Sequence, residues 1–194
     1  SEKIIEPNRK KLTDGTFKIL FAGRNVHFKG MHLGLQAFSK FSLSHQSVEL
    51  TIIGEGPERK KWQKLARKLH CEDKVRWLST SNQQDLFDAF DSFDVLLFPS
   101  LHDSGGMVAL EALAHGLPVI CLDLGGPGLI VNKECGIKII ATNKSKFEVV
   151  DNISNALEKL LLDKNLLSRL SAEAPKRAKE FSWKKLTKNI YNSI

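Results

Sequence analysis

The chain has 194 residues, of which 42% are hydrophobic and 26% charged, a composition typical of a globular domain with a full core. No apolar run approaches the roughly 18 residues of a membrane span, and the opening SEKIIEPNRK lacks the features of a signal peptide. These features predict a cytoplasmic protein. The net charge of +7 is compatible with nucleic acid, an anionic membrane surface or an anionic small ligand.

Much of the excess positive charge falls on two predicted helices, at 59–68 and 176–188. A solvated helix face is the expected use of this charge, and peripheral contact with acidic lipid at the inner face of the membrane is the second interpretation. The sequence holds no zinc finger or RNA-recognition signature, so nucleic acid is not an expected partner. The cysteines are scattered without a close pair, which predicts buried, reduced thiols.

Residues 1–16 mix charge with turn-forming residues and predict a linker that leads into the domain. The apolar run 17–22 predicts the first strand. Arg24 and Lys29 follow it, before a predicted helix that starts after Gly30. Because ligands of open α/β sheets bind beyond the carboxyl ends of the strands, these two cations suit a pair of linked phosphates. Taken alone, the same pattern also fits an ordinary turn with surface cations.

Strands are predicted next at 48–53 and 75–78, joined by a helix with Pro57 in its first turn and Trp62 in the core. The remaining expected elements are helices at 84–93, 106–114, 147–162, 164–180 and 182–194, strands at 94–98, 119–121 and 136–140, and a short helix that starts in the glycine-rich turn 124–128. Strands that alternate with helices in this way predict an α/β, Rossmann-like fold, a doubly wound parallel sheet of about six strands with helices on both faces.

The stretch 99–123 carries the most informative pattern. Glu111 is the charged residue of an otherwise apolar helix, which we expect to be buried, and a buried carboxylate needs a partner such as a ligand hydroxyl. If 104–108 form the first turn of this helix, their free N–H groups and the helix dipole create a phosphate site. Gly105 and Gly106 would let the phosphate approach the backbone closely.

Asp103 lies eight positions before Glu111, which corresponds to about 12 Å along a helix axis. This is about the reach from the ribose of a nucleotide-diphospho-sugar to its sugar ring. One carboxylate would bind ribose hydroxyls and the other sugar hydroxyls, with the diphosphate between them at the helix terminus. The sequence therefore predicts a nucleotide-sugar site.

The stretch 103–120 resembles the signature of family four of the retaining GT-B glycosyltransferases. It consists of an acid, Asp103, seven further residues, Glu111 and then ALAHGLPVI. The spacing G-R-x4-K-G at 23–30 is similar to the same family. The resemblance implies that 17–194 is the donor-binding domain of a two-domain enzyme, whose acceptor-binding domain is absent from this chain. In that family the first acid contacts the transferred sugar and the last Glu contacts ribose. This chain has Asp103 where Glu is usual and Gly105 where an aromatic residue is common.

The resemblance implies that Asp103, Arg24 and Lys29 are catalytic, with the cations and the helix terminus in place of a metal or other cofactor. The residues that it implies for donor binding are Arg24, Lys29, Leu78, Ser81, Asp103, Ser104, Gly105, Gly106, Met107, Val108 and Glu111. His102 is expected at the rim of the donor pocket. His115 is expected to be the C-cap of the helix predicted at 106–114.

The expected function is transfer of a sugar, with UDP-glucose as the preferred donor, to a saccharide or lipid-linked acceptor in polysaccharide, such as exopolysaccharide, or glycolipid synthesis. The chain by itself is expected to bind the donor and to transfer slowly or not at all. A non-catalytic nucleotide-sugar-binding module is an alternative, motivated by Asp103. Another GT-B enzyme, a sugar-nucleotide epimerase or a phosphorylase, is a further alternative, although the acids, histidines or cofactor lysine that these expect are not seen.

Overall fold

The computed structural model describes residues 15–79, 87 and 90–181. Most of the predicted linker, most of the helix expected at 84–93, Ser81 and the helix expected at 182–194 lie outside the described residues. Of the described helices, none combines the length and hydrophobicity that crossing a bilayer requires.

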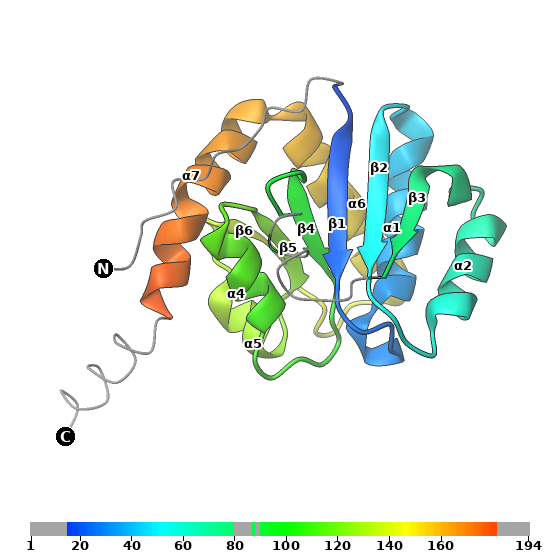
Figure 1. Cartoon of the computed structure of the whole chain (residues 1–194), viewed down its shortest axis with the longest axis horizontal. Helices are drawn as coiled ribbons and strands as arrows, with labels where there is room; N and C mark the ends of the chain where they lie inside the picture. Colours follow the sequence, from blue (N-terminus) through cyan, green and yellow to red (C-terminus); the bar gives the residue numbers. More distant parts are fainter. Residues whose placement is uncertain (1–14, 80–86, 88–89, 182–194) are drawn as a thin grey trace.

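In the described part of the chain, six parallel strands form one sheet (Figure 1). They are β1 (Phe17–Ala22), β2 (Val48–Ile53), β3 (Val75–Leu78), β4 (Val95–Phe98), β5 (Val119–Leu122) and β6 (Gly136–Ile139). Their order is β3-β2-β1-β4-β5-β6, so the direction of the strand order reverses between β1 and β4. A reversal of this kind opens a crevice beyond the carboxyl ends of the two central strands. The predicted fold class is confirmed.

Helices cover both faces of the sheet, as right-handed crossovers on the two sides of β1 and β4 require (Figure 1). They are α1 (Met31–Ser44), α2 (Arg59–Lys68), α4 (Met107–Ala114), α5 (Gly125–Ile130), α6 (Lys146–Leu162) and α7 (Lys164–Glu180), with short 3-10 turns η1 (His27–Lys29) and η2 (Glu72–Lys74). α1 packs against α6, and α4 packs against α7.

The core lies on both sides of the sheet because the central strands are apolar along their whole length. All four residues of β4 are buried, as are the last four of β1. Trp62 is only 1% exposed and meets the Phe21 ring edge to face, which confirms it as a core residue. The cysteines are free and buried as predicted, and burial raises the pKa of Cys121 to about 12.

Two helix starts differ from the prediction. α2 begins at Arg59, so Pro57 precedes the helix, because the Glu58 N–H donates to the Asn25 carbonyl across the neighbouring loop. α4 begins at Met107, one residue after the start predicted at 106. In both cases the N–H of the N-cap residue bonds outside the helix, from Glu58 to the loop after β1 and from Gly106 to the Asp103 carboxylate.

Candidate functional site

The loops after β1 and β4 are joined at the reversal of the strand order. The Phe28 carbonyl accepts hydrogen bonds from the Leu101 N–H at 2.8 Å and from the Ser100 hydroxyl at 3.2 Å. Gly30 has φ of 68°, and a Cβ there would lie 1.9 Å from the Pro99 carbonyl oxygen. This close backbone contact brings the Arg24–Lys29 loop and the Asp103 loop together, as the sequence predicted from their places after two strands.

Lys29 and Asp103 form an ion pair in this crevice, with side chains 16% and 15% exposed. The Lys29 ammonium also lies over the Phe98 ring, 4.9 Å from its centroid. Burial alone would raise the pKa of Asp103, but the bonds from Lys29 and Gly106 and the Lys29 charge outweigh it and lower the pKa. Asp103 is therefore held as a carboxylate beside a cation.

The Asp103 carboxylate also binds the backbone of its own loop. Its Oδ1 accepts hydrogen bonds from the Gly106 N–H at 2.7 Å and the Gly105 N–H at 3.2 Å. Two of the amides predicted to hold phosphate are therefore occupied by a side chain in this structure. The helix starts one residue after Gly106, whose φ of 59° makes it a left-handed N-cap, so the open N–H groups of the first turn begin at Met107.

Arg24, the second predicted cation, follows β1 by two positions and is exposed. Within the described residues its side chain has no hydrogen-bond or ion-pair partner. The loop after β1 therefore carries one cation that is paired with a carboxylate and one that is exposed.

Glu111 is partly exposed, which corrects the expectation of a buried carboxylate. α4 is buried along one face only, through Ala109, Ala112 and Leu113, because it packs against the sheet and α7 from one side. Met107 is 59% exposed and lies one turn before Glu111, on the same face. Met107 is therefore an apolar residue of α4 that lies outside the core.

The ends of β2 and β3 carry a polar network near Leu78, one of the residues that the family resemblance implies for donor binding. Leu78 is 41% exposed, and its carbonyl accepts a hydrogen bond from the Gly54 N–H. Arg59 pairs with Glu55, and its Nη1 lies 3.1 Å from the Ser79 hydroxyl, which itself donates to Glu55. The donor-binding position expected at Leu78 is therefore close to an ion pair.

α5, which starts in the glycine-rich turn predicted at 124–128, supports the Asp103 loop from the other side. The Gly126 N–H donates to the Asp103 carbonyl at 2.8 Å, and a Cβ on Gly126 would lie 2.7 Å from the Ser104 carbonyl oxygen. Two adjacent glycines at the start of a helix are the signal that could have predicted this close approach of two backbones.

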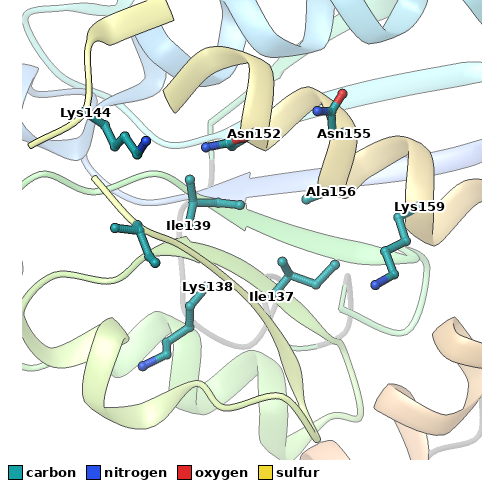
Figure 2. A pocket seen from close by; sticks show the side chains of 9 residues that line it. Ile137, Lys138, Ile139, Lys144, Asn152, Asn155, Ala156 and Lys159 are labelled. Atoms are coloured by element: carbon teal, nitrogen blue, oxygen red, sulfur yellow. The ribbon is translucent and has the colours of Figure 1, made fainter. Parts of the chain in front are cut away.

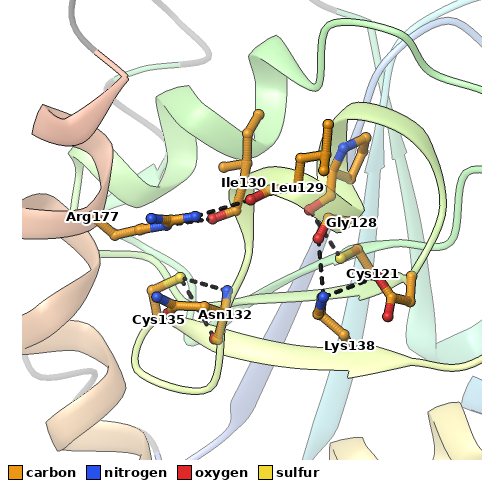
Figure 3. Close-up of polar contacts among 10 residues, drawn as sticks. Cys121, Gly128, Leu129, Ile130, Asn132, Cys135, Lys138 and Arg177 are labelled. Carbon is orange, nitrogen blue, oxygen red and sulfur yellow. Dashed lines mark hydrogen bonds and ion pairs between the residues drawn. The ribbon is translucent and has the colours of Figure 1, made fainter. Parts of the chain in front are cut away.

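α5 is itself held by long cationic side chains (Figure 3). Arg177 of α7 donates from Nε to the Ile130 carbonyl at 2.7 Å and from Nη2 to the Leu129 carbonyl at 2.9 Å. Lys138 of β6 donates to the Gly128 carbonyl at 3.1 Å and pairs with an aspartate after β5. These bonds satisfy carbonyls at the end of a short helix.

The two predicted peripheral histidines also have defined surroundings. His102 is exposed and its ring meets Phe28 edge to face, at the rim of the crevice. His115 is the C-cap residue of α4, as predicted, and its ring stacks on Phe87.

A separate shallow groove of about 360 Å³ lies between β6 and α6 (Figure 2). Ile137, Ile139 and Ala156 form its apolar part, and Lys144 and Lys159 stand at its sides. It is at the edge strand of the sheet and contains none of the predicted site residues. No group of three or more His, Cys, Asp or Glu side chains in the described ranges is arranged to hold a metal ion.

Comparison with known proteins relates this geometry to a family. The chain is 31% identical over 193 residues to an uncharacterised glycosyltransferase of Methanocaldococcus jannaschii, covering 98% of the chain and 48% of that protein. It is 30% identical over 193 residues to the D-inositol 3-phosphate glycosyltransferase of Corynebacterium jeikeium, covering 94% and 45%. The chain therefore spans about half the length of the curated relatives that it matches.

The fold also matches solved structures. The pneumococcal O-GlcNAc transferase GtfA, crystallised with UDP and GlcNAc, aligns with a TM-score of 0.78 at 19% identity, covering 91% of this chain and 35% of that protein. At this identity the likeness concerns the fold, one Rossmann-like domain of the GT-B type. Residues 2–177 match the family described as Glycosyl transferases group 1, and the chain belongs to that family.

Proposed function

We propose that this chain is the donor-binding half of a retaining glycosyltransferase and that it binds a nucleotide-diphospho-sugar at the carboxyl ends of β1 and β4. The observation that carries the proposal is the meeting of Lys29, Asp103 and the Gly105–Gly106 amides at the reversal of the strand order, with Arg24 exposed after β1. Family membership and the relatives' names support it.

The chemistry follows from where charge develops. When the sugar leaves its nucleotide, the terminal phosphate gains negative charge, and two cations next to a helix N-terminus stabilise that charge. Loss of one such stabilising group typically costs about 10²-fold in rate. No metal is required in this scheme. Asp103 would leave the loop to hold a sugar hydroxyl, and we expect no covalent glycosyl intermediate on it.

UDP-glucose is the proposed donor, with other UDP-hexoses next and GDP-mannose after them. A UDP complex of a protein with the same fold supports the choice of base. The proposed acceptor is a saccharide or a lipid-linked saccharide, held by a domain outside this chain. α2 has an exposed basic face, and we propose that this face contacts an anionic membrane. Such contact would suit a lipid-linked acceptor.

Calorimetric titration with UDP, GDP and ADP, followed by their sugars, tests the proposal. We expect one nucleoside diphosphate to bind, and Arg24→Ala and Lys29→Ala each to weaken binding about 10- to 100-fold, since each removes a charged hydrogen-bond donor. Lys144→Ala, which removes an exposed lysine paired with Glu148, is the control. Failure of every nucleotide to bind, or unchanged affinity in both crevice variants, would contradict the proposal.

A non-catalytic nucleotide-sugar-binding module is the second candidate, because Asp103 replaces the usual glutamate and is engaged by its own loop. Asp103→Glu in the complete two-domain protein separates the two candidates. A gain of transfer activity indicates an impaired site, and a loss indicates an active site tuned to its own donor.

A further inference from the structure

The carboxylate of Asp103 accepts hydrogen bonds from three donors that come from two loops of the crevice. Lys29 comes from the loop after β1, and the Gly105 and Gly106 N–H groups come from the loop after β4. A side-chain anion bound by an ammonium and two backbone amides has the same kind of partners as a bound phosphate.

The identity of the residue explains this arrangement. Aspartate readily accepts hydrogen bonds from the N–H groups two and three positions later, because its short side chain reaches back to its own backbone. Glutamate has one more methylene and does not make this turn in the same way. The Asp at a position where the family signature has Glu therefore places a negative charge inside the loop.

The donor diphosphate and the Asp103 carboxylate cannot both take the Gly105 and Gly106 amides, since each amide has a single N–H, and they compete for the charge of Lys29. Two like charges within hydrogen-bond distance of one ammonium repel each other, and the 15% exposure of Asp103 leaves little water to screen them. Arg24 is exposed and has no side-chain partner within the described residues, so it is available to an incoming phosphate before Lys29 is.

We propose that Asp103 is an internal competitor of the donor diphosphate: it binds Lys29 and the Gly105–Gly106 amides in the empty site and is displaced when the donor binds. This inference rests on the proposed function. Displacement releases the carboxylate from the loop at the moment when a sugar is present for it to hold. The same residue thus lowers affinity for the nucleotide and becomes free to position the sugar.

Calorimetric titration of the 194-residue chain with UDP, GDP and ADP tests the inference. Asp103→Asn keeps an acceptor for the loop amides but removes the charge, so the best-binding nucleoside diphosphate should bind about tenfold more tightly than to the wild type. Asp151→Asn is the matched control, since it also removes an aspartate paired with a lysine, Lys40 at 2.7 Å, on helices outside the crevice. Uridine, which lacks phosphate, should show no gain.

Two further variants make the outcome specific. Asp103→Ser retains a short oxygen acceptor and should also gain affinity, which covers the case in which Asp103→Asn folds poorly. In a Lys29→Met background, Asp103→Asn should bring a smaller gain, because the competition for Lys29 is gone and only the competition for the Gly105–Gly106 amides remains. Equal or weaker binding by both Asp103 variants, with wild-type binding intact, would overturn the inference and leave the proposed function standing. If none of the three nucleotides binds the wild type, the proposed function and the inference fall together.

Discussion

Gly30 shows how a single residue holds the two halves of the crevice together. Its φ is 68°, and an added Cβ would lie 1.9 Å from the Pro99 carbonyl oxygen. We expect Gly30→Ala to lower the free energy of unfolding by about 3–5 kcal/mol, since it adds a backbone clash to left-handed strain. Gly15→Ala is the matched control, because Gly15 has φ of 71° but, among the described residues, nothing within 4 Å of the added Cβ, and should cost about 1–2 kcal/mol.

Chemical denaturation of the two variants measures this difference. Similar losses for both would show that the contact between Gly30 and Pro99 adds nothing beyond the backbone strain that the two positions share.

His32 gives the stability of the fold a pH dependence. Its ring stacks on His27 with centroids 4.7 Å apart, and its buried Nδ1 has no hydrogen-bond partner in the part of the chain that the structure describes. Burial lowers the pKa of His32, with His27 and Lys146 adding to the effect and Glu58 opposing it. As the pH falls below about 6.5, the unfolded chain therefore takes up this proton before the folded chain does, and the folded state loses relative stability.

We accordingly expect the free energy of unfolding to fall between pH 7.5 and pH 5, and to fall less in His32→Gln. Urea denaturation across this range measures both slopes. His102→Gln, which changes an exposed histidine at the crevice rim, should keep the wild-type slope. A His32→Gln slope equal to that of the wild type would contradict the assignment.

At the scale of the elements, α5 couples α7 to the site. Arg177 bonds two carbonyls at the end of α5, and the Gly126 N–H at its start bonds the Asp103 carbonyl. Arg177→Lys keeps the charge but loses the planar fork, so we expect a loss of about 1–2 kcal/mol of stability and a several-fold weaker nucleotide affinity. Arg76→Lys, at an exposed pair with Glu49, should change stability by less than about 1 kcal/mol.

Denaturation and calorimetry on the same two variants separate a local effect from one that reaches the site. If Arg177→Lys is destabilised but binds the nucleotide as the wild type does, α5 supports the fold without positioning the Asp103 loop.

At the scale of the molecule, exposed apolar side chains lie on the loops and helix start that form the crevice. Phe28, Leu101 and Met107 are 45%, 39% and 59% exposed there, and we propose that they contact the second domain. We expect the isolated chain to bind the nucleotide-sugar without measurable transfer, and the two-domain protein to transfer. A radiolabelled-sugar assay with a panel of saccharide acceptors measures this, and efficient turnover by the isolated chain would contradict it.

The order of strands and helices could be predicted from the sequence because each element carries its own periodicity and turn residues. The apolar runs gave β1, β2 and β3 with their observed bounds, and the helix expected at 164–180 matches α7. Helix starts at the carboxyl edge were predicted less well, since Gly106 and Glu58 bond to groups outside their own helices.

The sequence by itself determined the family, the parallel sheet and the identity of the charged groups at the crevice, because these follow from local pattern and motif spacing. Only the tertiary structure decided that Asp103 turns back to Lys29 and its own amides, that Glu111 is partly exposed, and that Arg177 holds α5. The physical reason is that a side chain's partner depends on which backbones pack within hydrogen-bond reach. Lys29 and Asp103 are 74 positions apart along the chain, and the contact of Gly30 with Pro99 brings them together.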